Sequence, residues 1–340
     1  FIAVYINTKL SAGYIVREDT FIARFSILFI KVLILFHRIF TIRIIIVLSL
    51  PRSLRGRPSP ALRGVAPGGL RHYIYTINGL PVDLPKELHD RYRECLDILK
   101  ISQVQRRLIA PFSVFGYDLF HAGSTNSRFG VAIGIPVNFT YKSLEDLEKD
   151  DIQVNQKKVN WTSEVGQKLA DALILPEKAQ KFAICREILM TQNNKIIFES
   201  AYPFTCLFFA YNLSQMLNKK LNLYAAPNYM RGMLYTIVGT FSAGMYFLMK
   251  DMTEIYYETE ADKALCELGP EYIESGIIFY DKILQRNQAL RELMGGEGER
   301  KYSKLGNENF GLRQQRMALI HRKQFFEEKL KELQAKTLEE

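Results

Sequence analysis

Two long uncharged segments constrain the fold of this chain most strongly. Residues 201–217 and 232–249 are apolar and contain no charged side chain. Each is close to the lower limit of about 17 residues for a helix that crosses a bilayer. Basic residues flank both segments and tyrosines lie near their ends, as expected of anchors at a membrane interface. The pattern predicts a two-helix transmembrane hairpin over residues 201–249. The alternative is a pair of buried core helices in a soluble protein.

The positive charge of the chain belongs to its first part. Residues 1–71 contain eleven of the 45 basic residues and two of the 36 acidic ones, so they carry the whole net charge of +9. The remainder of the chain is electrically balanced. Because a nucleic-acid-binding domain carries a basic face on its fold, no nucleic-acid partner is expected.

Residues 1–71 form a basic N-terminal arm. Within it, residues 21–50 are apolar, and four basic residues from Arg17 to Arg38 follow one another at seven-residue intervals. On a helix this spacing drifts by only about 20° per step, so the charges form one stripe. A basic amphipathic helix of this kind is typical of a mitochondrial presequence. The alternatives are a membrane anchor, or a segment from a mistaken gene model that does not belong to the native protein.

Residues 72–200 have the composition of a folded α+β body. The apolar spacing predicts helices over residues 85–101, 161–173 and 177–192. Residues 111–120 and 129–139 are expected to be strands, joined in an antiparallel β-hairpin by the turn at 122–127. The predicted fold class is therefore α+β and mostly helical, with a small antiparallel hairpin or sheet packed on a helical body.

Residues 250–340 are predicted to be a helical region that packs back on the body. Apolar periodicity indicates helices over residues 253–268 and 271–294, and the glycines at 295–298 end the second one. The charged segment 311–334 is expected to be a solvated terminal helix.

The helix over residues 181–190 is where catalytic chemistry would be sought. A zinc-peptidase helix of the H-E-x-x-H type needs histidines at i and i+4, since these positions share one helical face. Here Arg186 and Met190 occupy the two positions, and Glu187 stands where the general base would be. Arginine is a permanent cation and a thioether is poorly matched to zinc. No catalytic residue, metal site or cofactor is therefore expected.

Several strings in the chain resemble the transmembrane protein 177 family. They are Val159–Thr162, Ala179–Ile188, Gly276–Leu284, Asn287–Leu293 and Gly298–Tyr302. The resemblance covers roughly residues 75–312. It implies an integral protein of the mitochondrial inner membrane that takes part in assembly of cytochrome c oxidase. The implied partners are newly made subunit II of that enzyme and its assembly chaperone, besides the lipid bilayer.

A more distant resemblance concerns the order of elements. In HtpX-like and CAAX-protease-like zinc metallopeptidases, a β-hairpin precedes the zinc-binding helix, a membrane hairpin can follow, and a later helix supplies a third ligand. This chain has the same order. Glu258 falls at the position of the third ligand, and Asp262 at a position that would contact a ligand from outside the metal site. Together with Arg186, Glu187 and Met190 they would be vestigial positions of a degenerate metallopeptidase-like fold.

Arg186 offers a physical replacement for the metal. If the two helices pack as in the peptidases, its guanidinium pairs with Glu258 or Asp262. The alternative is that Glu258, Glu260 and Asp262 form a solvated helix face. The leading functional expectation is a non-enzymatic membrane factor that stabilises an oxidase assembly intermediate. The alternatives are a membrane-bound zinc-type peptidase with atypical ligands and a general quality-control factor for membrane proteins.

Overall fold

The computed structural model describes residues 76–77, 80–81, 83–114, 116–127, 130–147, 153–154, 157–311 and 313–339. The expected presequence and linker, residues 1–71, lie outside the described residues. The described part divides into two compact units. One is a helical pair, residues 203–246. The other, called the body below, comprises the described residues of 76–202 and 247–339.

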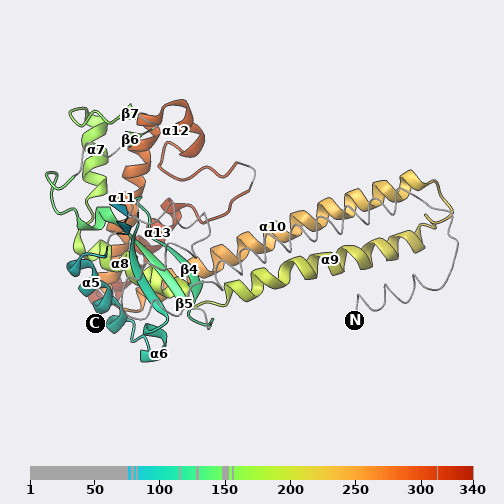
Figure 1. The fold of residues 1–340 in the computed structure, drawn as a ribbon, viewed down its shortest axis with the longest axis horizontal. Helices are drawn as coiled ribbons and strands as arrows, with labels where there is room; N and C mark the ends of the chain where they lie inside the picture. Colours follow the sequence, from blue (N-terminus) through green and yellow to red (C-terminus); the bar gives the residue numbers. More distant parts are fainter. Residues whose placement is uncertain are drawn as a thin grey trace. The chain divides into compact units, whose positions relative to one another are not determined.

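Helices make up most of the body (Figure 1). They include α5 (Lys86–Ile98), α6 (Gln103–Arg106), α7 (Glu164–Leu173), α8 (Glu177–Thr191), α11 (Pro270–Met294), α12 (Gly296–Lys301), α13 (Leu319–Glu339) and a 3₁₀ turn at Val137–Thr140. The predicted starts of α7 and α8 are confirmed to within three residues. Ser163 caps α7 by accepting a hydrogen bond from the Gly166 amide at 3.1 Å. Pro176 precedes α8, where its missing N–H costs nothing.

The sheet differs from the predicted hairpin. Its strands are β3 (Ile109–Val114), β4 (Phe120–Ser124) and β5 (Gly130–Pro136), in the order β3-β5-β4. β4 and β5 form an antiparallel hairpin, but β3 pairs with β5 in parallel. The predicted strand 111–120 is wrong because the chain turns within it, at Gly116, whose φ of +126° favours glycine. Two short strand pairs complete the set: β1 (Thr76–Ile77) with β2 (Leu80–Pro81), and β6 (Gln153–Val154) with β7 (Lys157–Lys158).

The core of the body lies where α8, α11 and α13 meet. The ring of Phe182 on α8 contacts Phe279 and Tyr280 on α11 and Phe326 on α13, with centroids 5.3 to 5.9 Å apart. Gly276 on α11 allows this close approach. A Cβ there would lie 2.9 Å from both the Phe182 and Phe326 rings. β5 is buried along its whole length and adds Ile133 and Ile135 to the same core.

The terminal segment also departs from the prediction. The helix α13 begins at Leu319 rather than near residue 311, because Gly311 adopts a φ of +64° and the chain that follows is irregular. The first half of α13 is not solvated as predicted, whereas residues 331–336 are exposed. Phe326 is fully buried against α8 and α11, and Arg322 is only 3% exposed. The high charge content of the segment predicts exposure, and it gives no sign that Phe326 and Arg322 are buried.

The two apolar segments both form helices, α9 (Lys195–Lys220) and α10 (Asn228–Cys266). Within the helical pair they lie side by side: Ser242 Oγ donates to the Cys206 carbonyl at 2.7 Å, and Asn218 Nδ2 donates to Tyr235 Oη at 2.9 Å. Among the described helices only α10 is both long and apolar enough to span a membrane. Only 11% of its most apolar stretch is buried, whereas the core helix of a soluble protein is mostly buried. A second crossing by residues 201–217 stays a prediction.

Candidate functional site

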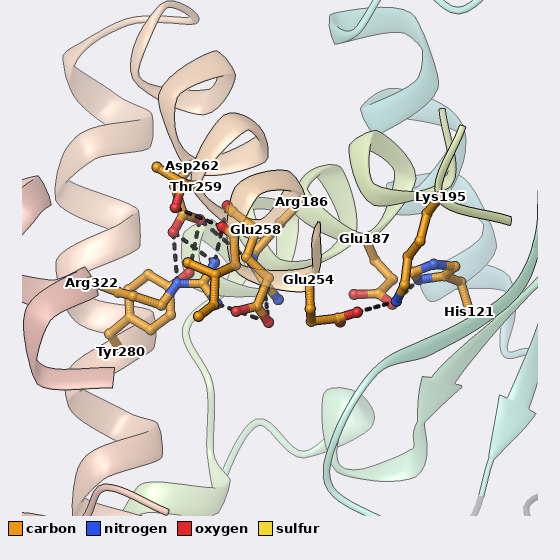
Figure 2. Close-up of polar contacts among 11 residues, drawn as sticks. His121, Arg186, Glu187, Lys195, Glu254, Glu258, Thr259, Asp262, Tyr280 and Arg322 are labelled. Carbon is orange, nitrogen blue, oxygen red and sulfur yellow. Dashed lines mark hydrogen bonds and ion pairs between the residues drawn. The ribbon is translucent and has the colours of Figure 1, made fainter. Parts of the chain in front are cut away.

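Four helices of the body bring charged side chains together in its interior (Figure 2). Arg186 comes from α8, Glu258 and Asp262 from α10, Tyr280 from α11 and Arg322 from α13. Glu258 and Asp262 are one helical turn apart, so both carboxylates leave α10 on the same face. These five residues are called the charge cluster below.

Asp262 makes the shortest contacts of the charge cluster. Arg322 Nε donates to Asp262 Oδ2 at 2.7 Å, and Arg322 Nη2 lies 2.6 Å from the same oxygen. Tyr280 Oη donates to the other oxygen, Oδ1, at 2.9 Å. Arg186 Nε lies 3.5 Å from Oδ1. The Arg322 guanidinium also stacks over the Tyr280 ring, 4.9 Å from its centroid, so Asp262 and Tyr280 fix its position together.

Glu258 joins the two arginines from the other side. Its Oε1 lies 3.4 Å from Arg186 Nη2 and 3.5 Å from Arg322 Nη1. Glu258 and Asp262 are 4% and 3% exposed. Burying an isolated carboxylate is costly, but here two carboxylates face two guanidiniums and the formal charges cancel. The charge cluster is therefore electrically balanced without any bound ion.

Burial and charge act in opposite directions on Arg186. Burial alone would lower the pKa of its guanidinium, but the negative charges of Asp262 and Glu258 raise that pKa above its ordinary value. For Tyr280, burial raises the pKa of the phenol well above 10.0, so its hydroxyl stays protonated as the donor to Asp262. At neutral pH these effects keep Arg186 charged and Tyr280 protonated.

Glu187 points away from the charge cluster, toward the sheet (Figure 2). Its Oε1 lies 2.6 Å from His121 Nδ1 on β4, and the residue is 7% exposed. Burial alone would raise the pKa of this carboxyl. The hydrogen bond and charge of His121, with the charges of Arg186 and Arg316, hold it below the ordinary value of 4.5. Nearby, Lys195 pairs with Glu254, and that pairing likewise lowers the pKa of Glu254 against the opposing effect of burial.

Of the predicted site residues, Arg186 contacts Glu258 and Asp262, whereas Glu187 contacts His121 instead. The expected pairing of Arg186 with Glu258 and Asp262 is confirmed, and the solvated-face alternative is wrong for these two carboxylates. It holds for Glu260, which is exposed. Met190 is buried, with 5% of its surface exposed.

Sequence reasoning missed three of the residues: His121, Tyr280 and Arg322. Tyr280 lies in a helix that the sequence indicates only by its apolar periodicity, and Arg322 lies in a segment expected to be solvated. Local patterns carry no signal for a charge that is neutralised by residues sixty positions away.

The chemistry of the donor set favours a structural role. In the part of the chain that the structure describes, no group of three His, Cys, Asp or Glu residues is arranged to hold a metal ion. Glu258 and Asp262 already neutralise two guanidiniums, so a cation added beside them would meet two positive charges. A cavity of about 20 Å³ lined by Asn138, Phe279 and Arg286 has room for a single water. Its lining includes none of Arg186, Glu187, Met190, Glu258 and Asp262.

Comparison with known proteins identifies the family. The family model described as Transmembrane protein 177 matches residues 99–323. A Transmembrane protein 177 of Xenopus laevis is 33% identical over 236 residues, which cover 67% of this chain and 74% of the relative. The chain belongs to the transmembrane protein 177 family. The protein of that name from Danio rerio is 31% identical, over 67% of this chain and 74% of its own length. The one from Homo sapiens is 28% identical, over 69% of this chain and 75% of its own length.

No solved structure matches the chain, so the likeness to zinc metallopeptidases stays a prediction. The region matched by the transmembrane protein 177 model contains all five residues of the charge cluster, with Glu187 and His121. Family membership and helix α10 together support an integral membrane protein.

Proposed function

We propose that this member of the transmembrane protein 177 family is a non-enzymatic assembly factor of the mitochondrial inner membrane. It would bind newly made subunit II of cytochrome c oxidase, together with the assembly chaperone of that subunit, and protect both from degradation. The family resemblance supplies the partners. The observation that carries the non-enzymatic part is the position of Arg186, whose guanidinium contacts both carboxylates of α10.

The contacts of Arg186 and Glu187 support a structural role for both residues. Arg186 balances Glu258 and Asp262, while Glu187 is engaged by His121. A general base in a peptidase must face a water that a metal activates. Glu187 instead holds a hydrogen bond inside the body, between α8 and β4. The arrangement supports a fold that positions surfaces for a partner rather than one that cleaves a substrate.

The helical pair supports membrane insertion of both helices. Large apolar side chains of α9 are exposed, among them Phe204 at 62% and Phe208 at 72%. Phe241 of α10 is 59% exposed as well. Soluble proteins rarely expose apolar surface in such quantity, because its hydration is unfavourable. With no charge in residues 201–217, we propose that α9 and α10 both cross the inner membrane.

Affinity isolation from mitochondria tests the proposal. A C-terminally tagged chain is isolated after pulse labelling of mitochondrial translation. The proposal predicts that labelled subunit II and its chaperone co-isolate, with little of the other labelled membrane subunits. Equal recovery of many nascent membrane proteins would instead indicate a general quality-control factor. Stoichiometric zinc in the purified protein, with cleavage of a substrate, would indicate a peptidase and contradict the proposal.

A further inference from the structure

The turn between α9 and α10 carries positive charge without any acidic residue near it in the sequence. Lys219 and Lys220 end α9, and Arg231 lies in the first turn of α10. No aspartate or glutamate occurs between Glu199 and Asp251. These three basic residues and the turn that joins them are called the basic turn below, residues 219–231.

The basic turn has a defined structure. Asn222 adopts a φ of +49°, and the Leu223 amide donates to the Asn218 carbonyl at 3.0 Å. These features close the C-terminus of α9 and bury Leu223. Arg231 donates to Asn228 Oδ1, and its guanidinium lies 5.8 Å from the centroid of the Tyr224 ring. The three basic residues therefore lie in an ordered turn at one end of the helical pair.

Cations of the body that lie near the apolar segments are engaged differently. Lys195 pairs with Glu254, and Arg313 Nε lies 2.9 Å from Asp251 Oδ2. Carboxylates of the chain itself satisfy those two cations.

In the basic turn, Arg231 is engaged within the protein. Lys219 and Lys220 are exposed, and residues 200–250 contain no carboxylate. These two ammonium groups are therefore open to a negative charge from another molecule.

Apolar side chains surround the charges of the basic turn. Leu221 and Tyr229 are 58% and 66% exposed, and Met230 is also exposed. Cations mixed with exposed tyrosine and aliphatic side chains match the headgroup layer of a bilayer, where phosphate lies beside the acyl boundary. An acidic protein segment would satisfy the lysines but would leave these apolar side chains in water.

We infer that the basic turn binds the phosphate groups of anionic phospholipids in the leaflet that it reaches. Lys219 and Lys220 supply the ammonium groups, and Arg231 with Tyr224 shapes the turn that presents them. The inference rests on the proposed membrane insertion of the helical pair and is independent of the role in cytochrome c oxidase assembly. It adds a lipid specificity that the proposed function does not contain.

Lipid retention measures this specificity. The full chain is reconstituted in nanodiscs with equal amounts of phosphatidylcholine and phosphatidylglycerol of matched acyl chains. Native mass spectrometry then counts the lipids that stay bound to the released protein. The wild type should retain phosphatidylglycerol preferentially, and the variant Lys219→Gln/Lys220→Gln should reduce this preference on the order of tenfold. The control Lys304→Gln/Lys331→Gln, which removes two exposed lysines of the body, should retain it.

Three results would overturn the inference. They are an absent preference in the wild type, an equal loss in both double variants, and full displacement of the bound lipid by inorganic phosphate. A chain that does not enter nanodiscs at all would instead contradict the proposed membrane insertion, and the inference with it. Failure of subunit II to co-isolate would leave the lipid preference untouched, so the two proposals are separable.

Discussion

At the scale of single residues, the body depends on a balance of buried charge. Arg186 and Arg322 face Glu258 and Asp262 with little access to water. A buried ion pair adds less stability than its Coulomb energy suggests, because both charges lose their hydration. Removal of one partner is strongly destabilising, because it leaves an uncompensated charge in the interior. The charge cluster therefore specifies how α8, α10 and α13 pack, more than it adds net stability.

A double-mutant cycle tests this balance. Arg186→Met should lower the free energy of unfolding by about 3–5 kcal/mol, because it leaves two carboxylates facing one cation. Adding Glu258→Gln restores neutrality, so the double variant should be more stable than the sum of the single effects predicts, by about 0.5–3 kcal/mol. Denaturant unfolding in detergent micelles measures each variant. The exposed pair Glu164–Lys168 is the control, and its coupling should be the smaller one because water screens the two charges. A buried coupling no larger than this control would refute the account.

The pair of His121 and Glu187 predicts a dependence on pH. The pKa of Glu187 is lowered in the folded state, so its ionised form stabilises the fold. That contribution is present at pH values above 4.5, the ordinary value, and is lost as the pH falls through the lowered pKa. Glu187→Gln should therefore reduce the thermal midpoint at neutral pH, and the difference from wild type should shrink below pH 4.5. Glu260→Gln, at an exposed carboxyl, supplies the background. A difference that stays constant across the acid range would disprove this role for Glu187.

At the scale of elements, local sequence patterns predicted the helices well. Proline and serine at the starts of α8 and α7, with regular apolar spacing, are local signals. The prediction of the sheet was wrong because strand pairing depends on contacts between distant residues rather than on local signals. Gly116 breaks what looks like one strand, and the pairing of β3 with β5 is settled by contacts far along the chain. The burial of Phe326 in a charged segment could not be predicted either, because its partners lie on α8 and α11.

The contact of α8, α11 and α13 depends on one glycine. Gly276→Ala would place a Cβ within 2.9 Å of both the Phe182 and Phe326 rings. Two packed aromatic rings would have to move, so we expect the free energy of unfolding to fall by about 1–3 kcal/mol. The control is Gly296→Ala at the start of α12, where a Cβ meets nothing within 4 Å. Equal stability of the two variants would show that the three helices are less tightly packed than described.

At the scale of the whole molecule, the chain combines a pair of apolar helices with a body in which the buried charges of the charge cluster cancel. Membership of the transmembrane protein 177 family and the exposed apolar surface of the helical pair point to the bilayer. The sequence predicted Arg186 beside Glu258 and Asp262 because a known helix pattern fixed their faces. It did not predict Arg322 and Tyr280, since no pattern linked α13 and α11 to that place. With these two residues, Arg186, Glu258 and Asp262 become part of one set of internal contacts that joins four helices.

The central claim is that the chain acts by binding and not by catalysis, and Glu187→Gln tests it most directly. Glutamine is close in shape and still accepts a hydrogen bond from His121, but it cannot act as a general base. Mitochondria that lack the chain are complemented with wild type or with Glu187→Gln at matched protein levels, and the lifetime of pulse-labelled subunit II is measured. The account predicts that both restore the same lifetime and co-isolate with the subunit. A loss of at least tenfold in the stabilising effect, at an unchanged level of the variant protein, would contradict it.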